Sequence, residues 1–287
     1  MPRAAAEGCS LEYDTVGPES GEPLVVVQGL GDQLTKWADG FPQALAARGF
    51  FVIRFDNRDA GLSTSFSEAG APDPSGSAKP PYRLEDMAAD VVAVLDAAGV
   101  GRAHLVGASM GGMIAQLVAA GHPHRTLSLT SVMSSTGNPA LPPPTPEAVT
   151  ALTAPAPDPA DEKAYLDHAA AAARTLGSPA YPYDEAELRA TLLSTVHRAH
   201  NPGGVQRQLA ALLADGDRRA RLRHITAPTL VIHGADDPLI PPAAGEDTAS
   251  TIPGARLLVL PGMGHNLPRE LYDRVADAIA QLAATAA

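Results

Sequence analysis

His104-Leu105-Val106-Gly107-Ala108-Ser109-Met110-Gly111-Gly112 is the stretch that decides the fold of this 287-residue chain. A short apolar run ends in G-A-S-M-G-G and opens into an apolar segment with the composition of a helix. This pattern predicts a nucleophile elbow, a sharp strand-to-helix turn that holds Ser109 in a strained conformation with its hydroxyl above the sheet edge. Gly107 and Gly111 flank the turn because side chains there would collide with a neighbouring strand or helix. The alternative is a serine that only caps the helix.

Apolar runs alternate with amphipathic segments on both sides of the elbow. Continuous apolar runs, rich in β-branched residues, predict buried parallel strands at 24–27, 51–55, 127–133, 228–232 and 256–260. Apolar residues on one side predict helices at about 34–48, 84–99 and 269–284. We therefore expect an α/β fold: a mainly parallel sheet with helices on both faces and the functional residues at the carboxyl ends of the strands.

The composition changes after about residue 134. The proline-rich stretch NPALPPPTPEAVTALTAPAPDPADEK does not fit an alternation of strands and helices, and helical patterns follow it near 161–176, 184–200 and 205–214. We interpret residues 137–222 as an inserted helical cap between two parts of one core, 1–136 and 223–287. Within this cap, Tyr181 and Tyr183 either line a pocket or pin the cap to the core.

Charge and cysteine content narrow the function classes. The formal net charge of −11 disfavours nucleic acid, anionic membrane surfaces and strongly anionic substrates. A single cysteine, Cys9, excludes an intrachain disulfide and a multi-cysteine metal site. The sequence shows neither a signal-peptide pattern nor an apolar run of membrane-spanning length, so we expect a cytoplasmic protein. No metal motif, dinucleotide fingerprint or phosphate loop is present, and no cofactor is expected. The sequence does not reveal the oligomeric state.

Three chemically suited groups follow three predicted strands in the order serine, acid, histidine. That order, together with the elbow, is typical of an α/β hydrolase. Ser109 would attack a carbonyl carbon, His265 would accept its proton, and a buried carboxylate from the turn containing Asp236 and Asp237 would orient the imidazole. Leu30, in the glycine-rich turn after the strand at 24–27, is placed to offer a backbone N–H to the oxyanion.

Two nearby groups of polar residues have structural interpretations. His233 precedes the acidic turn and is expected to be structural. The charged cluster at 56–59 is expected to brace a tight strand exit through charge-assisted hydrogen bonds of Asp56 and Arg58.

Four stretches carry a resemblance to a known family: FVIRFDNRDAGLST, MAADVVAVLDAAGVGRAHLVGASMGG, APTLVIHGADDPLIPP and IPGARLLVLPGMGHNLP. The chain resembles the cap-bearing esterases of the α/β-hydrolase superfamily, most closely the aclacinomycin methylesterase type, which cleaves methyl esters of polyketides. The resemblance implies Ser109, Asp237 and His265 as the catalytic triad, and Leu30 and Met110 as oxyanion-hole donors. One departure is the turn QGLGD, where better-known members carry a histidine before the glycine; the donor there is a backbone group.

The expected function is hydrolysis of a small-molecule carboxylic ester through an acyl-enzyme. The substrate pocket is expected between the strand exits and the cap, and the inward-facing positions of the cap helices carry few fixed charges. Such a pocket suits neutral esters that are short to medium in length or hydrophobic. Two alternatives stay open: a cofactor-free perhydrolase or haloperoxidase-like acyl transfer, and a non-catalytic ligand receptor on the same fold.

Overall fold

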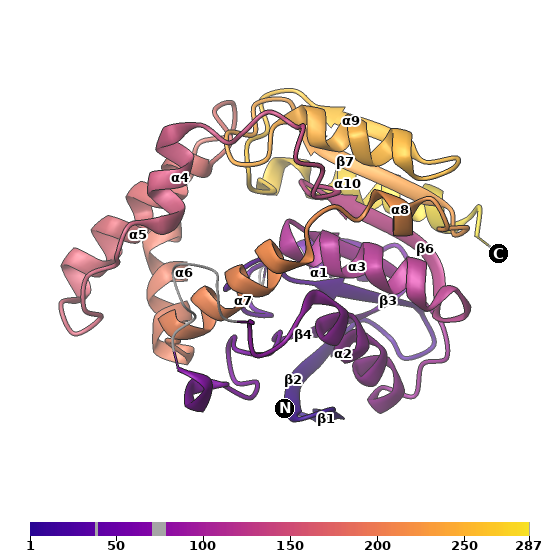
Figure 1. The fold of residues 1–287 in the computed structure, drawn as a ribbon, viewed down its shortest axis with the longest axis horizontal. Coiled ribbons are helices and arrows are strands. Elements are labelled where there is room, and N and C mark those ends of the chain that lie inside the picture. The colour runs from indigo at the N-terminus through magenta and orange to yellow at the C-terminus, as the bar shows by residue number, and fades with distance from the viewer. Residues whose placement is uncertain (38–39, 71–78, 287) are drawn as a thin grey trace.

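The computed structural model describes residues 1–37, 40–70 and 79–286. In this part of the chain eight strands form one sheet in the order β1-β2-β4-β3-β5-β6-β7-β8 (Figure 1). The strands are β1 (Arg3–Ala6), β2 (Cys9–Val16), β3 (Glu22–Val27), β4 (Phe50–Phe55), β5 (Ala103–Ala108), β6 (Thr126–Val132), β7 (Thr229–Gly234) and β8 (Arg256–Leu260).

The sheet is parallel from β4 to β8, and only β1 and β2 run antiparallel to their neighbours. Every residue of β4, β5 and β7 is buried. Strands covered on both faces read as continuous apolar runs, which explains why these segments do not alternate in the sequence. The prediction of a mainly parallel sheet is confirmed.

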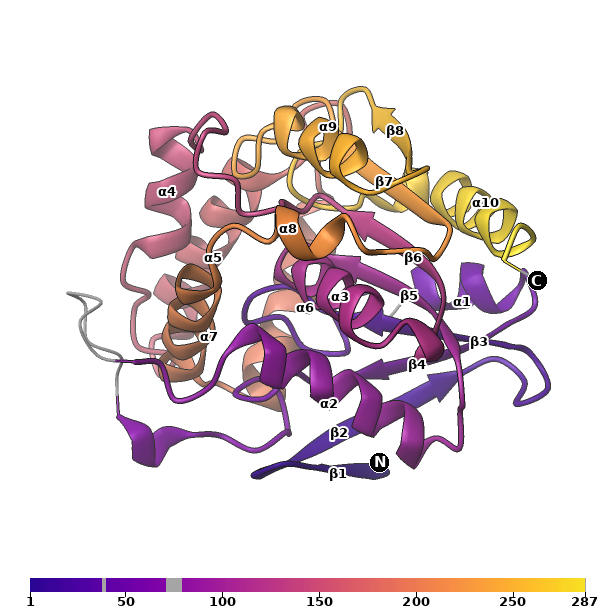
Figure 2. The ribbon, with the colours of Figure 1, turned by 45° about the vertical axis from the view of Figure 1, so that its right-hand side comes forward.

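Helices cover both faces of the sheet (Figure 2). Val25 and Val27 of β3 pack in a cluster with α2 (Leu84–Ala97) and α3 (Met110–Gly121). Leu24 and Val26 pack in a second cluster with α1 (Phe41–Ala46) and α10 (Tyr272–Ala283). Burying one such side chain is worth about 1.5–3 kcal/mol, so the two clusters fix the sheet between its helices. A further helix, α9 (Pro242–Thr251), follows β7.

The prediction of one helix over 34–48 is wrong. Residues 34–37 form turns, residues 38–39 lie outside the described part of the chain, and α1 begins only at Phe41. The backbone N–H of Leu34 donates to the buried Asp56 Oδ1 over 2.7 Å. This contact with a distant carboxylate holds the chain in a turn where the local apolar pattern favours a helix.

Five helices come between β6 and β7: α4 (Pro146–Thr153), α5 (Glu162–Leu176), α6 (Glu185–Arg198), α7 (Pro202–Asp215) and α8 (Arg219–Leu222). The predicted helices near 161–176, 184–200 and 205–214 correspond to α5, α6 and α7. Helix α4 was not expected in a proline-rich stretch, but Pro146 stands in its first turn, where proline is tolerated, and Thr145 caps it. We call residues 137–222 the cap segment; that they form a separate domain stays a prediction.

The cap segment lies beyond the carboxyl ends of the central strands, whose arrowheads point toward α4–α7 (Figure 2). The loops that follow β3, β5, β7 and β8 therefore begin on the side of the sheet that faces the cap segment (Figure 2). Within the described ranges, no helix combines the length and apolar character needed to cross a lipid bilayer.

Candidate active site

Ser109 occupies the turn between β5 and α3 with φ 54° and ψ −122°. Positive φ is costly for a residue with a side chain and is characteristic of a strained nucleophile elbow. The turn leaves no space at its glycines: a Cβ on Gly107 would lie 2.2 Å from the Gly111 carbonyl oxygen, and one on Gly111 would lie 2.1 Å from that of Val27. The strand, turn and helix predicted for residues 104–112 are present, with the glycines where close packing requires them.

His265 lies in the loop after β8 and joins Ser109 to Asp237 by hydrogen bonds. Its Nε2 is 3.1 Å from Ser109 Oγ, and its Nδ1 is 2.8 Å from Asp237 Oδ2. Asp237, in the turn after β7, accepts two further bonds at Oδ1 from the backbone N–H groups of Leu239 and Ile240, both 2.9 Å. These bonds hold the carboxylate in one orientation toward the ring.

The second aspartate of this turn points elsewhere. Asp236 Oδ2 accepts a hydrogen bond from the Gly262 N–H at 2.8 Å, so its carboxylate ties two neighbouring loops together. His233 is fully buried, with Nε2 2.8 Å from the Ile240 carbonyl oxygen. Burial lowers the pKa of His233, although the bond to Ile240 and the nearby Asp237 oppose this, so its ring stays neutral at pH 7. The structure thus brings Asp237, and not Asp236, to His265.

The turn after β3 packs against the elbow. A Cβ on Gly29 would lie 3.5 Å from Ser109 Cβ. Within the described residues, neither the Leu30 N–H nor the Met110 N–H forms a hydrogen bond. Met110 begins α3, and the first N–H groups of a helix have no acceptor inside the helix. In the described part of the chain, these two backbone donors are therefore unpaired in the turns that meet at Ser109, and their role as oxyanion-hole donors stays a prediction.

The comparison with known proteins decides the family. Residues 22–268 match the family model described as the alpha/beta hydrolase fold. The chain is an α/β hydrolase. It is 31% identical to the rhodomycin D methylesterase of Streptomyces peucetius, over 94% of this chain and 93% of the relative. It is 28% identical to 3-oxoadipate enol-lactonase 2 of Acinetobacter baylyi, over 89% and 86%. The crystal structure of the enol-lactonase from Burkholderia xenovorans has a TM-score of 0.70 and 26% identity, with 99% of each chain covered.

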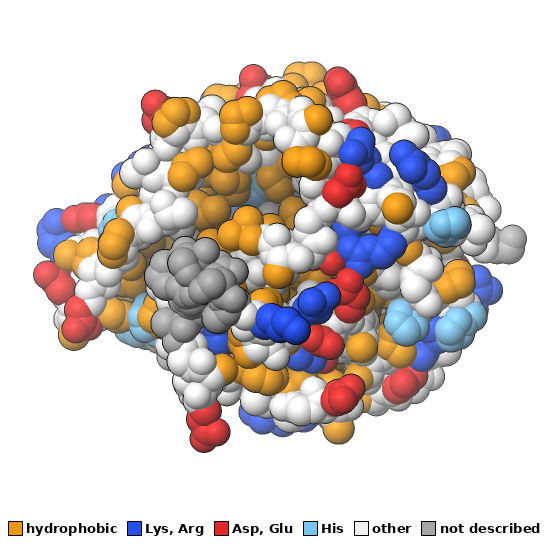
Figure 3. Space-filling model, in the orientation of Figure 1, with side chains coloured by type: hydrophobic (Ala, Val, Ile, Leu, Met, Phe, Trp, Pro, Cys, Tyr) orange, Lys and Arg blue, Asp and Glu red, His pale blue; other side chains and the backbone are white. Residues whose placement is uncertain are grey.

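A cavity of about 410 Å³ lies between the cap segment and the core of this hydrolase, and Asn266, the residue after His265, is part of its lining. It is bounded by the turn at 32–37, the cap helices α5 and α6, and residues 266–272, which directly follow His265. Its aromatic lining residues are Trp37, Tyr181, Tyr183 and Tyr272. Both cap tyrosines thus line a cavity, which was one of the two alternatives. In Figure 3 the visible face is hollowed between cap segment and core, with hydrophobic side chains around the hollow.

Charged side chains also line this cavity, two of them from the cap segment and four from the core, so the expectation of few fixed charges at the cap's inward-facing positions stays a prediction. They are Asp32, Lys36, Asp184, Glu187, Arg269 and Glu270. Lys36 pairs with Asp32 at 2.9 Å and Arg269 pairs with Glu187 at 2.5 Å, which neutralises four of the six. Burial raises the pKa of Tyr272 to about 12 and also raises that of Tyr183. Both hydroxyl groups therefore remain hydrogen-bond donors at neutral pH.

The loop after β8, which carries His265, is hydrogen-bonded to the end of α5 and to the connection between α5 and α6. The His265 N–H donates to the Leu176 carbonyl at 2.7 Å, and the Gly264 N–H donates to Ser178 Oγ at 2.9 Å. The Ser178 hydroxyl in turn donates to Asn266 Oδ1 at 2.6 Å. Sequence reasoning missed these contacts, because a serine 86 positions from its partner leaves no local pattern.

The charged cluster at 56–59, after β4, braces the strand exit as expected, but the sequence did not predict its ion-pair partners. Arg58 forms a bidentate ion pair with Asp90 of α2, with bonds of 2.6 and 2.7 Å. Asp59, fully buried and with φ 66°, forms a similar pair with Arg207 of α7 at 2.8 and 2.7 Å. Asp56 reaches the cap segment through Arg198 of α6 at 2.8 Å. The strand exit is thereby fastened to both the core and the cap segment.

Proposed function

We propose that this α/β hydrolase is a serine esterase that cleaves carboxylic esters through an acyl-enzyme. The observation that carries the proposal is the continuous hydrogen-bonded chain from Ser109 Oγ through His265 to Asp237. A serine hydroxyl is a weak nucleophile on its own and needs a base within hydrogen-bond reach, which His265 Nε2 provides. Ester hydrolysis needs no further reactant than water.

In the acylation step, Ser109 Oγ forms a bond to the ester carbonyl carbon while its proton passes to His265 Nε2. The negative charge that develops on the carbonyl oxygen is stabilised by the free N–H groups of Leu30 and Met110. Collapse of the tetrahedral intermediate breaks the bond to the alcohol oxygen, which takes the proton from His265. Asp237 keeps the ring in the productive tautomer and stabilises its charged form.

In the deacylation step, water attacks the acyl carbon of the ester now attached to Ser109. His265 accepts a proton from that water and returns it to Ser109 Oγ as the carboxylic acid is released. The enzyme is then restored with no net change in protonation.

We propose neutral esters, short to medium or hydrophobic, as substrates, with the methyl ester of a larger hydrophobic molecule as a refinement. Three points support this choice: the aromatic lining of the 410 Å³ cavity, the formal charge of −11 and the printed names of the methylesterase and enol-lactonase relatives. A site inside a negatively charged protein disfavours anions at long range. A cytoplasmic location is part of the proposal.

The test is release of p-nitrophenol from p-nitrophenyl butyrate by the wild type and by Ser109→Ala. Loss of the nucleophile in another serine hydrolase reduced turnover about a million-fold, and we expect a loss of that order here. The exposed Ser67→Ala variant serves as a matched control and should keep full activity. Wild-type protein that releases no p-nitrophenol above the uncatalysed rate would indicate a receptor, and a Ser109→Ala variant with near-normal turnover would remove Ser109 from the mechanism.

A further inference from the structure

Gln208 of α7 is a fully buried polar residue that the reaction scheme above does not use. Its side-chain amide bridges two backbone groups of the core. Oε1 accepts a hydrogen bond from the Gly31 N–H at 2.8 Å, and Nε2 donates to the Arg58 carbonyl at 2.7 Å. Both polar atoms of the amide are therefore bonded to the core, and the side chain is shielded from solvent.

The turn that Gln208 holds is the one that carries Leu30. Gly31 has φ +71°, and a Cβ on it would lie 2.8 Å from Val205 Cγ2 of α7. Val205 and Gln208 are three positions apart and so share one helix face. That face presses on the turn with an apolar group and binds it with a polar one, which leaves the Leu30-Gly31 peptide little freedom to rotate.

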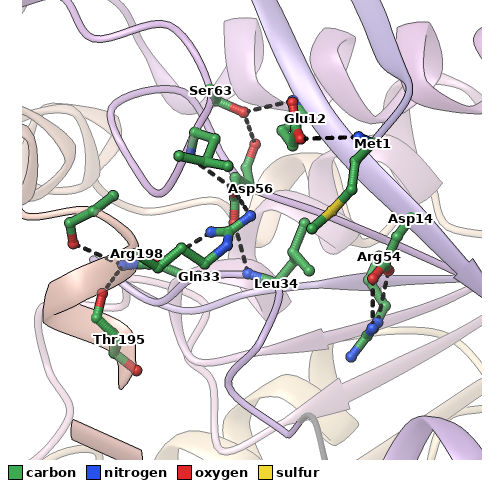
Figure 4. Close-up of polar contacts among 12 residues, drawn as sticks. Met1, Glu12, Asp14, Gln33, Leu34, Arg54, Asp56, Ser63, Thr195 and Arg198 are labelled. Carbon is green, nitrogen blue, oxygen red and sulfur yellow. Dashed lines mark hydrogen bonds and ion pairs between the residues drawn. The ribbon is translucent and has the colours of Figure 1, made fainter. Parts of the chain in front are cut away.

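A second cap helix holds the same turn two residues further on (Figure 4). Gln33 Nε2 donates to the Thr195 and Ala199 carbonyl groups at the end of α6, both at 2.9 Å. Arg198 Nη1 donates to Gln33 Oε1 at 2.7 Å, and Arg198 Nη2 lies 2.8 Å from Asp56 Oδ2. The turn is thus held by α7 on one side and by α6 on the other.

From this geometry we infer that Gln208 is a positioning residue for the oxyanion hole, acting from the cap segment through the Gly31 N–H. The inference rests on the proposed function, in which the Leu30 N–H is an oxyanion donor. A peptide unit is planar, so fixing the Gly31 N–H also fixes the Leu30 carbonyl and restricts the backbone of Leu30. An oxyanion exists only in the transition state and the intermediate, so Gln208 raises kcat and has little effect on KM.

The test compares three variants with the wild type on p-nitrophenyl butyrate. Gln208→Met keeps the length of the side chain but removes both hydrogen bonds. Gln208→Glu keeps an acceptor for the Gly31 N–H and loses the donor to Arg58. The matched control is Gln116→Met, because Gln116 of α3 is equally buried and its amide donates to Ser131 Oγ and not to the turn that carries Leu30. Thermal unfolding and the affinity for an alkyl boronic acid, which mimics the tetrahedral intermediate, are measured for each variant.

For Gln208→Met we expect kcat to fall roughly 10- to 100-fold, KM to stay within about threefold, and boronate affinity to fall in parallel with kcat. Gln208→Glu should lose less than Gln208→Met, and Gln116→Met should keep kcat within about threefold even if it lowers the unfolding temperature.

Unchanged kcat in a folded Gln208→Met would overturn the inference, as would an equal fall in kcat for Gln116→Met, which would indicate a structural effect. If Gln208→Met does not fold, Gln208→Asn decides, because it withdraws the amide by one methylene and so breaks the bond to the Gly31 N–H; its kcat must fall while KM holds, and an unchanged kcat would overturn the inference. The proposed function fails separately, through activity in Ser109→Ala.

Discussion

Replacing Asp237 by asparagine removes one charge from the hydrogen-bonded chain while preserving its shape. The introduced amide can still accept the Leu239 and Ile240 N–H bonds at 2.9 Å through its oxygen. Its NH₂ group then faces His265 Nδ1 at the position of Oδ2, 2.8 Å away. Two donors cannot share that distance, so Nδ1 must give up its proton and Nε2 must carry it. A protonated Nε2 in the neutral ring cannot accept the proton of Ser109.

The same change in a serine protease reduced turnover about ten-thousand-fold, which corresponds to about 5.4 kcal/mol of activation free energy. We expect a loss of this size, because the bond between His265 and Asp237 is short and Asp237 is buried. The side chain that replaces Asp237 keeps its two backbone bonds, so the unfolding temperature should change little compared with kcat.

The measurement is kcat/KM on p-nitrophenyl butyrate at pH 8 for Asp237→Asn and Asp236→Asn. Asp236 is adjacent and chemically identical, but its carboxylate accepts from the Gly262 N–H and not from His265, so its variant should keep activity within about tenfold. More than a tenth of wild-type activity in Asp237→Asn, or a larger loss in Asp236→Asn, would refute the assignment of the acid.

Two further predictions concern the scaffold. Gly111→Ala places a methyl group 2.1 Å from the Val27 oxygen and should prevent folding or lower the free energy of unfolding by at least about 3 kcal/mol. Gly121→Ala has open space around it and should leave the unfolding temperature unchanged. Equal stability of the two variants in thermal unfolding would contradict the packing argument. Arg207→Met leaves Asp59 buried without its ion-pair partner and should lower the free energy of unfolding by about 3–5 kcal/mol at pH 7. Burial alone would raise the pKa of Asp59, but its hydrogen bonds, first of all the one from Arg207, hold the pKa below the usual value. The contribution of the ion pair to the free energy of unfolding is therefore complete above about pH 4 and is lost as pH falls through the lowered pKa. Urea titrations of wild type and variant at pH 7 and pH 3 check this, and a difference that does not shrink on acidification would exclude Asp59 as its source.

The parts of the fold that follow from local sequence were predictable. The strands from β3 onward are apolar runs bounded by turn residues, and Ser109, Asp237 and His265 each follow one of them. In a parallel sheet the carboxyl ends of the strands share one edge, so residues at those ends can meet even when they are far apart in the sequence. Ser109 and Asp237 are 128 positions apart, and Asp237 and His265 are 28 positions apart. The assignment of Asp237 over Asp236 needed the family resemblance.

The contacts of the cap segment with the core were not predictable in the same way. Gln208 meets Gly31 across 177 positions, and Arg207 meets Asp59 across 148. A buried glutamine and an exposed one look alike in a sequence, since their difference lies in the partner that the fold supplies. The predicted start of the helix at 34–48 was wrong for a related reason, because the Leu34 N–H donates to the distant Asp56 carboxylate.

The place where the cap segment joins the core has a consequence for how such enzymes diversify. Leu129 of β6 pairs with Thr229 of β7, so the chain leaves and re-enters the sheet between two neighbouring strands. Closing a flexible loop costs entropy only with the logarithm of its length, and doubling the loop adds about 0.6 kcal/mol. Parts of the cap segment outside the core contacts of α6 and α7 can therefore be lengthened, shortened or exchanged with little thermodynamic cost to the sheet. Evolution can alter what such an enzyme accepts while leaving the residues that perform the reaction in place.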